Sequence, residues 1–477
     1  MRNRLLLLGA ALAAVGASLA SGFHFDDYAI FSDPVLMSSA GGMGIWALRR
    51  TQPLTDLTFW LNYMAGGRDP LGYHLVGLAL HLGAVLLAYE CLRRLLPERA
   101  ALAAAAVFAI HPLQAEAVNY VWARGAVLGA LLCFASLLAW LNRRFWPAVA
   151  WFALALLASE QCAAFPLALA LIHWTGQRSE TPKAGRSGGA HMAAMLVLAL
   201  AAAARLASAT LAAHAAVAPS KYFLAQGPAL WRYLRLFLAP FGFTVDPDIQ
   251  VPAIWVGAML WVAVLAAAAR LWQARRNAWA MWLLAGLLLL LPSLLPGADL
   301  YADRRMYLPM FAFAAAAGWL LTRVRTQALA AGVAAVLTVL SLVRTTVWLS
   351  DRSLWQEAVR LAPEKARPKI WLSRDLPAAQ ALELLQRAQA AAPHDPAVPA
   401  EMGKILLQER QVDPALIEFG QALALDPNNA EYYNNRGVAL GMSGLTEAAR
   451  ADFQRALTID PNLSEARQNL EKIPPAP

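Results

Sequence analysis

The sequence predicts an all-α protein in which a polytopic bundle of membrane helices is followed by a short α-solenoid of paired-helix repeats. Three observations predict this fold class. The 477 residues are 59% hydrophobic and 15% charged, which is more apolar than a soluble globular chain of this length. The apolar residues fall into blocks of roughly 15 to 22, the length that crosses a bilayer as a helix. The blocks end near Trp348, and a different, periodic pattern follows.

The net charge of +9 does not point to nucleic acid as a partner. The arginines stand in pairs at the ends of apolar blocks and form no mixed basic and aromatic patch, so we interpret them as topology signals. The cysteines, Cys91, Cys133 and Cys162, all lie inside apolar blocks. We therefore expect small buried hydrophobes there, and neither a disulfide framework nor a metal site.

The chain begins with Arg2 and Arg4, and an apolar run follows from Leu5 to Gly22. This segment is either a first membrane helix or a cleaved signal peptide, since Ser18-Leu19-Ala20 would suit a signal peptidase. Both interpretations place residues 23–70 outside the cytoplasm.

Ten further apolar segments follow, and with the first helix they predict about eleven crossings, give or take one or two. Arginine and lysine gather in alternate loops, as short cytoplasmic loops should. An odd number of crossings places the C-terminus outside. The predicted spans run near residues 72–92, 99–111, 125–141, 146–158, 162–175, 190–216, 253–272, 278–296, 307–321 and 327–346. The cationic loops hold Arg93, Arg94 and Arg99, then Arg143 and Arg144, then Arg178, Lys183 and Arg186, then Arg270, Arg275 and Arg276, then Arg323 and Arg325.

After the last span, five residues recur at an offset of 34. Small residues at helix contacts and a proline that closes each unit are typical of the tetratricopeptide repeat. We expect a membrane domain over 1–349 and a repeat domain over 350–473, with clear repeats at 396–429 and 430–463 and degenerate units before them. One repeat cannot bury its own apolar face, so about three units form the smallest domain. The recurring residues are Gly403, Ala415, Phe419, Ala422 and Pro427, and then Gly437, Ala449, Phe453, Ala456 and Pro461.

The first outside segment carries two adjacent carboxylates, Asp26 and Asp27, shortly after the first helix. Surface acids need no special explanation. However, adjacent carboxylates repel each other, and near a low-dielectric boundary the pKa of one of them tends to rise, which would suit a general base. We favour Asp27 slightly, because it lies one residue farther from the first helix.

Other polar residues recur at helix ends on the same face of the membrane, where they could assemble into one cavity. Ionisable groups at membrane depth are costly and usually face a bundle interior or an aqueous pocket. The alternative is a set of ordinary outside loops, with Arg232 and Arg235 extending to lipid head groups. The residues are His111, Glu116, Arg124, Glu160, Gln161, Lys221, Tyr222, Arg232, Arg235, Asp299, Asp303, Arg304 and Arg305.

Several stretches occur in the order found in one family. They are Phe25-Asp26-Asp27, Ser32-Asp33-Pro34, Gln52-Pro53-Leu54-Thr55-Asp56-Leu57-Thr58-Phe59, Gly72-Tyr73-His74-Leu75-Val76 with His81, His111-Pro112-Leu113-Gln114-Ala115-Glu116-Ala117-Val118, Ser159-Glu160-Gln161, Trp231-Arg232-Tyr233-Leu234-Arg235 and Ala302-Asp303-Arg304-Arg305-Met306-Tyr307-Leu308-Pro309. Through them the chain resembles the transmembrane and tetratricopeptide-repeat proteins, which are membrane O-mannosyltransferases of the GT-C architecture, and their bacterial relatives. It departs from the family at Ser159, where Lys is expected, and at Asp303, where Glu is expected. The shorter repeat array is a third difference.

The resemblance implies an inverting transfer of a sugar, for example mannose, from a polyprenyl-phosphate donor to a hydroxyl of a protein or other acceptor outside the cytoplasm. It gives the role of general base to Asp26 or Asp27. Phosphate is a good leaving group, so the site needs cations on its oxygens and no general acid. The expected phosphate ligands are Arg304, Arg305, Arg232 and Lys221. The expected cavity-lining residues are His111, Glu116, Arg124, Glu160, Gln161 and Asp303. No metal ligand is assigned, and a divalent cation stays open as a cofactor.

A second hypothesis is a non-enzymatic, membrane-anchored repeat scaffold for protein-protein interaction. The recurring acids, histidines and arginines on one face favour the enzyme, because a simple anchor has no use for them. A transporter is a weaker third option, since only Arg205 lies clearly within a span. We expect a multi-pass protein of a bacterial inner membrane, in contact with membrane lipid, whose periplasmic repeats bind a protein acceptor or partner.

Overall fold

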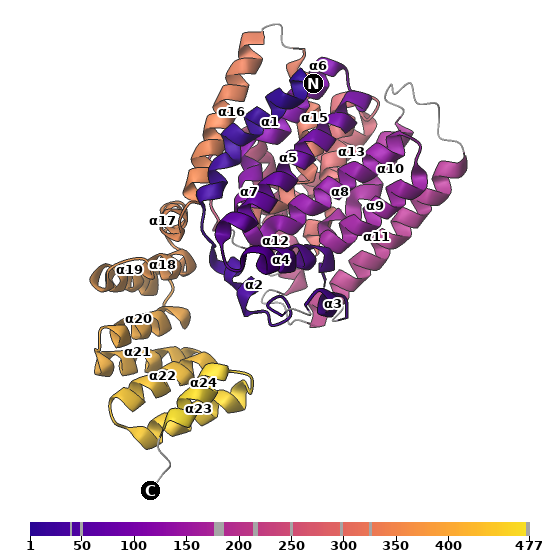
Figure 1. The fold of residues 1–477 in the computed structure, drawn as a ribbon. Coiled ribbons are helices and arrows are strands. Elements are labelled where there is room, and N and C mark those ends of the chain that lie inside the picture. The colour runs from indigo at the N-terminus through magenta and orange to yellow at the C-terminus, as the bar shows by residue number, and fades with distance from the viewer. Residues whose placement is uncertain are drawn as a thin grey trace. The chain divides into compact units, whose positions relative to one another are not determined.

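The computed structural model describes residues 1–38, 41–47, 51–175, 186–212, 218–248, 251–295, 299–323 and 327–473, whose regular elements are all helices (Figure 1). The all-α prediction is therefore confirmed for this part of the chain. The chain divides into two compact units. The membrane unit comprises Met1–Val245 and Ile249–Ser350, and the repeat unit comprises Asp246–Asp248 and Asp351–Pro477.

The membrane unit is built from long apolar helices and short connecting turns. Its α-helices are α1 (Arg2–Val15), α2 (Ala29–Ser32), α3 (Gly41–Ala47), α4 (Pro53–Gly66), α5 (Pro70–Leu95), α6 (Glu98–Ile110), α7 (Ala115–Asn119), α8 (Arg124–Leu141), α9 (Phe145–Ala158), α10 (Phe165–Trp174), α11 (Arg186–Ala212), α12 (Pro219–Leu238), α13 (Ile254–Gln273), α14 (Ala278–Leu289), α15 (Pro309–Leu321) and α16 (Gln327–Val347). Its 3₁₀ turns are η1 (Gly16–Ala20), η2 (Phe25–Tyr28), η3 (Pro112–Gln114), η4 (Val121–Ala123), η5 (Glu160–Ala164), η6 (Leu291–Leu294) and η7 (Asp303–Met306).

Six helical segments in the described residues are long and apolar enough to cross a membrane, which makes this a candidate multi-pass membrane protein. They are Arg2–Ala20, Pro70–Leu95, Val121–Leu141, Gly188–Ser208, Ile254–Gln273 and Ala328–Val347. A seventh results if Glu98–Ile110 and Pro112–Asn119, which meet at a bend of 50°, are one broken span. About eleven crossings stays a prediction, because α9, α10 and α15 are shorter than the roughly 20 residues that a bilayer requires. Arg178, Lys183 and Arg325, three of the predicted topology signals, lie outside the described residues.

Helices differ in how deeply they lie in the bundle. In the most apolar stretch of the span that contains α8, 72% of the residues are buried, whereas the corresponding value for α13 is 6%. We therefore place α8 in the centre and α13 at the periphery. Between α6 and α15 the backbones approach closely, because a Cβ atom added at Gly318 would lie 2.6 Å from the carbonyl oxygen of Ala100. Small residues allow this close packing where lipid provides no hydrophobic drive for helix association.

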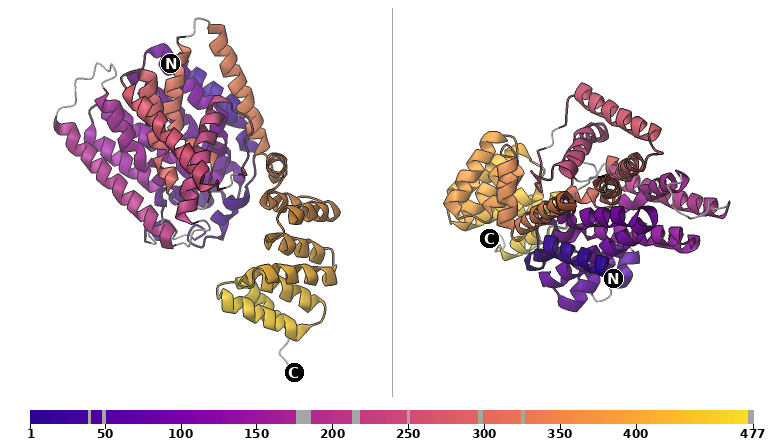
Figure 2. Two further views of the ribbon diagram at one scale, coloured as in Figure 1. Left: turned by 180° about the vertical axis from the view of Figure 1, so that it is seen from behind. Right: turned by 90° about the horizontal axis from the view of Figure 1, so that it is seen from above.

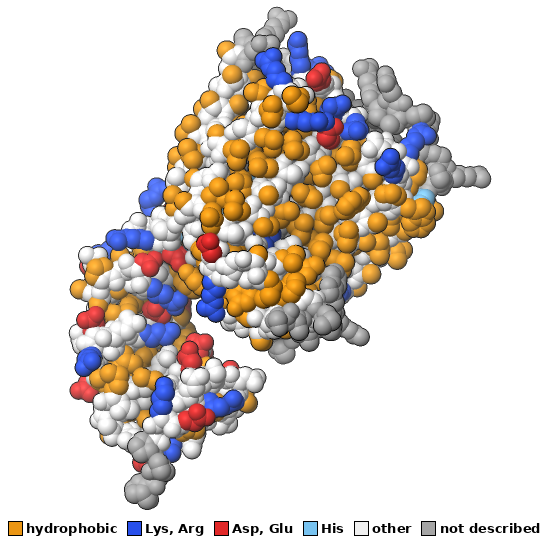
Figure 3. Space-filling view, in the orientation of Figure 1, with side chains coloured by type: hydrophobic (Ala, Val, Ile, Leu, Met, Phe, Trp, Pro, Cys, Tyr) orange, Lys and Arg blue, Asp and Glu red, His pale blue; other side chains and the backbone are white. Residues whose placement is uncertain are grey.

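The surface of the membrane unit carries a broad field of hydrophobic side chains (Figure 3). Lysine and arginine gather at the end of the bundle that holds the N-terminus. The helices run alongside one another, with α9 packed against both α8 and α11 (Figures 1 and 2). A laterally apolar bundle with cations at one end is the distribution that a lipid bilayer requires.

The repeat unit consists of helices packed in consecutive pairs: α17 (Asp351–Leu361), α18 (Ala366–Ser373), α19 (Ala378–Ala391), α20 (Ala397–Gln408), α21 (Val412–Leu425), α22 (Ala430–Met442), α23 (Thr446–Ile459) and α24 (Ser464–Lys472). Equivalent residues make equivalent contacts. A Cβ atom added at Gly403 would lie 2.7 Å from the Phe419 ring, and one added at Gly437 would lie 2.8 Å from the Phe453 ring. The recurring glycines thus give the phenylalanines of the paired helices room to pack.

Candidate functional site

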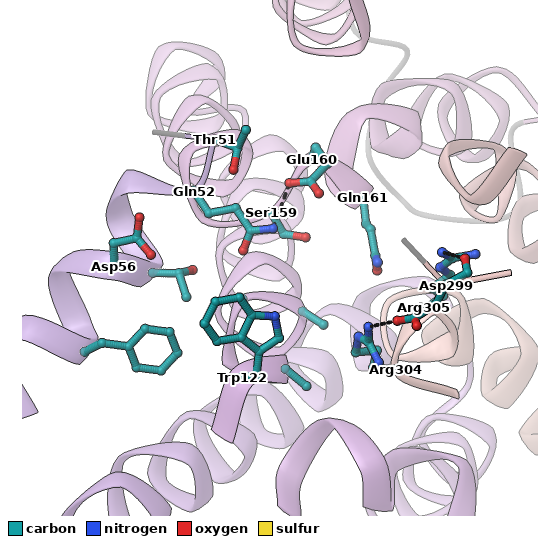
Figure 4. A pocket seen from close by; sticks show the side chains of 15 residues that line it. Thr51, Gln52, Asp56, Trp122, Ser159, Glu160, Gln161, Asp299, Arg304 and Arg305 are labelled. Atoms are coloured by element: carbon teal, nitrogen blue, oxygen red, sulfur yellow. Dashed lines mark hydrogen bonds and ion pairs between the residues drawn. The ribbon is translucent and has the colours of Figure 1, made fainter. Parts of the chain in front are cut away.

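A cavity of about 450 Å³ opens among helix ends of the membrane unit (Figure 4). Residues from α4, η4, α8, η5 and η7 surround it, so distant parts of the sequence meet there. Its lining residues are Thr51, Gln52, Thr55, Asp56, Phe59, Trp122, Ala123, Gly125, Ala126, Ser159, Glu160, Gln161, Asp299, Arg304 and Arg305. The volume falls in the range of roughly 300 to 1,000 Å³ that is usual for small-molecule sites.

Arg304 forms one wall of the cavity together with two carboxylates. Its Nη1 lies 2.8 Å from Oε1 of Glu116, and its Nη2 lies 2.6 Å from Oδ2 of Asp299. Burial alone would lower the pKa of the Arg304 guanidinium, but the two carboxylates outweigh burial and raise that pKa above its ordinary value. Glu116 accepts a second hydrogen bond, 2.9 Å long, from the backbone N–H of Asp303. Arg304 is therefore a paired cation that also ties η7 to α7.

Arg305 lies beside Arg304 but is held differently. It donates to the backbone carbonyl of Asp299 at 2.7 Å and to the Tyr222 hydroxyl at 3.0 Å. Among the described residues it forms no ion pair with a carboxylate. Arg305 thus lines the cavity with its guanidinium held by neutral groups, and within the described residues no salt bridge neutralises its charge. A guanidinium without a carboxylate partner is suited to a bidentate contact with a phosphate.

Amides and carboxylates from η5, from α4 and from Gln52, which precedes α4, line another part of the cavity wall (Figure 4). Gln52 donates to Oε2 of Glu160 at 2.9 Å. Within the described residues no hydrogen bond holds the side chain of Gln161, which extends toward Arg304 in Figure 4. Asp56 completes this part of the wall.

Trp122 lies between Asp56 and Arg304 in Figure 4. Its side chain lines the cavity and is 41% exposed. The Phe59 ring lies nearly parallel to the indole, with the centroids 6.4 Å apart and an angle of 11° between the planes. The guanidinium of Arg124 lies over the Phe59 ring, 4.6 Å from its centroid. Trp122 therefore belongs to a cluster of aromatic and cationic side chains at the cavity wall.

Asp26 and Asp27 lie on η2, next to the cavity but outside its lining. Asp26 is exposed, and its Oδ2 accepts a 2.8 Å hydrogen bond from the Tyr120 hydroxyl. The Tyr120 ring lies below the Arg304 guanidinium, 5.7 Å from its centroid. Tyr120 therefore connects the accessible carboxylate to the cationic wall.

Asp27, in contrast, is fully buried. Its Oδ2 accepts the His24 backbone N–H at 2.9 Å, and its Oδ1 accepts the Trp122 backbone N–H at 2.7 Å. Burial raises the pKa of Asp27 to about 7, although both hydrogen bonds and nearby His24 act to lower it. Because both of its oxygens accept hydrogen bonds, Asp27 fastens η2 to η4.

The same segment is anchored to the end of α16. The His24 ring lies 2.6 Å from the backbone carbonyl of Trp348, which also accepts the Ser21 hydroxyl. The indole of Trp348 stacks on Tyr120, the partner of Asp26, with centroids 5.7 Å apart. The chain at the end of α16 therefore helps to position the segment that carries Asp26 and Asp27.

A second polar layer lies behind the cavity. Asp303 is buried and accepts the Tyr301 hydroxyl, and burial raises the pKa of its carboxyl above the ordinary value. Arg232 lies over the Tyr301 ring, 5.0 Å from the centroid, and donates to the carbonyl of Gly242. Neither Arg232 nor Asp303 is in the cavity lining.

Three other expected site residues also lie outside the lining. His111 accepts the Leu113 backbone N–H, and its other ring nitrogen lies 3.1 Å from the carbonyl of Phe237, so the ring joins α6 to α12. Arg124 is buried and donates to Asn62, Thr58 and the carbonyl of Tyr73. Lys221 is exposed at the start of α12.

The structure thus brings Glu160, Gln161, Arg304 and Arg305 together in the lining, with Glu116 directly behind them. Trp122 was not singled out from the sequence. Its neighbours Tyr120 and Arg124 mark a polar helix end, but aromatic residues are common at membrane interfaces, and the sequence does not separate the two situations. No group of three or more potential metal ligands occurs among the described residues.

Two protein-family models match the C-terminal part of the chain. One, described as a TPR repeat, covers residues 403–444, and the other, described as a tetratricopeptide repeat, covers residues 430–463. The prediction of tetratricopeptide repeats is confirmed by these matches.

Parts of the chain are also similar to animal proteins named as protein O-mannosyl-transferases. Over 106 residues it is 46% identical to Protein O-mannosyl-transferase Tmtc1 of Drosophila melanogaster, a match that covers 22% of this chain and 11% of that protein. It is 33% identical over 144 residues to human Protein O-mannosyl-transferase TMTC1, covering 27% and 16%. It is 27% identical over 149 residues to human Protein O-mannosyl-transferase TMTC3, and this match covers 28% of this chain and 16% of that protein. The matches thus span less than a fifth of each relative, and the similarity is distant and partial.

Proposed function

We propose that this protein is a membrane glycosyltransferase that transfers a sugar from a polyprenyl-phosphate donor to a hydroxyl of a protein or other acceptor. The observation that carries the proposal is Arg305, which lines the cavity and whose guanidinium has no carboxylate partner among the described residues. The distant similarity to protein O-mannosyl-transferases supports the reaction class.

The cations act on the leaving group. As the bond between the anomeric carbon and the phosphate oxygen breaks, negative charge grows on the phosphoryl oxygens, and a fixed guanidinium stabilises that charge. Arg305 supplies this contact, and Arg304 adds to the positive field while it remains paired with Glu116 and Asp299. Arg232 and Lys221, which the lining does not include, contribute at most from a distance.

The general base is Asp26 rather than Asp27. Asp26 is exposed and oriented by Tyr120, so its carboxylate is accessible to an acceptor hydroxyl. Asp27 is buried with both oxygens bonded to backbone N–H groups, which suits a residue that positions the loop. In the reaction the acceptor oxygen bonds to the anomeric carbon, its proton passes to Asp26, and polyprenyl phosphate departs on the opposite side. The sugar configuration is therefore inverted.

The site faces the outside of the membrane, and the repeats lie on that side as well. This assignment rests on the alternation of cationic and acidic loops over about eleven crossings, in a bacterial inner membrane. The tetratricopeptide repeats, which pair helices to form binding surfaces, hold the protein acceptor or a partner protein.

The test is an assay of purified protein with a panel of polyprenyl-phosphate sugars and hydroxyl-bearing peptides. Transfer is expected with at least one donor, and Asp26→Asn is expected to lower its rate by about a hundredfold to ten-thousandfold, the usual effect of losing a general base. Asp69→Asn is the matched control, because Asp69 is exposed on the same outside segment and caps α5 through an oxygen that Asn retains. Its rate should not change.

The alternative is the membrane-anchored repeat scaffold, which the repeat unit alone would explain. It predicts no transfer with any donor. Transfer by the Asp26→Asn, Asp27→Asn double variant at nearly the unmodified rate would instead remove these residues from the mechanism while leaving an enzyme.

A further inference from the structure

Trp122 presents an aromatic surface inside the cavity that the phosphate chemistry does not use. A tryptophan 41% exposed within a concave, polar site loses favourable burial unless a ligand covers it. The Phe59 ring lies nearly parallel to the indole, and the backbone N–H of Trp122 donates to the buried Asp27 carboxylate, so the position of Trp122 at the cavity wall is defined by its neighbours. An aromatic face in a ligand cavity is characteristic of a recognition element.

The groups around this face are hydrogen-bonding groups. Gln52 and Glu160 are joined by a single 2.9 Å bond, which leaves Oε1 of Glu160 without a hydrogen bond in the described part of the chain. The Gln161 amide likewise has no bond to a described residue. Together they offer amide donors, amide acceptors and one carboxylate acceptor in the cavity that the Trp122 indole also lines (Figure 4).

We propose that Trp122, Gln52, Glu160 and Gln161 form the pyranose-binding subsite of the donor. A pyranose ring has a face of C–H bonds and a rim of hydroxyls, so it matches an aromatic plane bordered by hydrogen-bonding groups. Gln161 extends toward Arg304 in Figure 4, and Arg305, which supplies the proposed phosphate contact, follows Arg304 in the same lining. The inference rests on the proposed function and assigns these four residues to recognition of the sugar of the donor.

Asp27 gains a specific task from this assignment. Its carboxylate bonds the backbone N–H of Trp122 at 2.7 Å, so it holds the residue that carries the sugar platform. The first outside segment thereby contributes to both reactants, with Asp26 facing the acceptor and Asp27 positioning the donor subsite.

The experiment compares the binding of sugar-free polyprenyl phosphate with that of polyprenyl phosphate carrying mannose, glucose or galactose, using the full-length protein in lipid nanodiscs. The unmodified protein should bind at least one sugar-bearing lipid about tenfold more tightly than the sugar-free lipid, an advantage of about 1.4 kcal/mol. Trp122→Ala should abolish this preference without changing the binding of the sugar-free lipid. Trp122→Phe should retain part of it, because a smaller aromatic face remains.

Trp231→Ala is the matched control. Trp231 is 39% exposed, close to the value for Trp122, but it is not in the cavity lining, so the variant should keep the sugar preference. Equal binding of all the lipids by the unmodified protein, or an unchanged preference in Trp122→Ala, would overturn the subsite and leave the phosphate site standing. Binding of none of the lipids would overturn the proposed function as well.

Discussion

Replacing Arg304 and Arg305, two adjacent arginines in the cavity wall, is expected to affect two different properties: protein stability for Arg304 and donor binding for Arg305. Arg304 is paired with Glu116, whose side chain is 4% exposed, whereas Arg305 is bonded to a hydroxyl and backbone carbonyls. We consider the replacement of each arginine by methionine, which has an unbranched side chain without charge. Replacing Arg304 in this way leaves the buried Glu116 carboxylate without its cationic partner, whereas replacing Arg305 removes no ion pair among the described residues.

The magnitudes follow from these partners. Removing one member of a buried ion pair typically costs about 3 to 5 kcal/mol, so Arg304→Met should lower the free energy of unfolding by that order. Adding Glu116→Gln to Arg304→Met should recover much of the loss, because the amide is neutral and still accepts the Asp303 N–H. A hydrogen bond to a charged group is worth about 1.5 to 3 kcal/mol, so Arg305→Met should weaken donor binding by roughly tenfold to a hundredfold.

The two quantities are measured on the same samples. Denaturant unfolding in detergent gives the stability, and titration with polyprenyl phosphate in nanodiscs gives the affinity. The expected result is a stability loss for Arg304→Met and an affinity loss with near-normal stability for Arg305→Met. If Arg305→Met binds the lipid normally, or is destabilised as strongly as Arg304→Met, the division between a structural and a phosphate-binding cation is wrong.

Three further measurements address other parts of the chain. Burial raises the pKa of Asp27 from 3.8 to about 7, so the folded state binds this proton more tightly than the unfolded state does. Stability should therefore fall by about 4 kcal/mol as the pH rises from about 4 to 7, and Asp27→Asn should flatten that dependence in pH-resolved unfolding curves. Gly437→Ala places a Cβ 2.8 Å from the Phe453 ring and should destabilise the repeat unit by about 1 to 3 kcal/mol. Gly420→Ala is the control, because a Cβ there would have no atom within 4 Å, and it should not destabilise the unit. Equal melting curves for the two variants would contradict this packing. A C-terminal reporter active only in the cytoplasm should stay silent, and its activity would refute the proposed orientation.

Much of the fold follows from the sequence because its signals are local. Apolar length predicts a membrane helix wherever it occurs, and long helices appear at Pro70–Leu95 and Ile254–Gln273 as the hydropathy indicates. The number of crossings is not determined in this way. Short apolar helices such as Phe145–Ala158 have the composition of a span without its length, and composition does not reveal how such a helix meets the bilayer.

The properties of the candidate site likewise fall into those that the sequence predicts and those that depend on the tertiary structure. The sequence by itself identified the repeats and the polar helix ends, including Glu160, Arg304 and Arg305, because ionisable residues beside apolar blocks are conspicuous. Only the tertiary structure decided which of these residues share a cavity, which of two neighbouring arginines is paired, and that Asp27 is buried whereas Asp26 is accessible. These properties depend on contacts between segments far apart in the chain, and neither residue type nor spacing encodes which of two adjacent side chains turns inward.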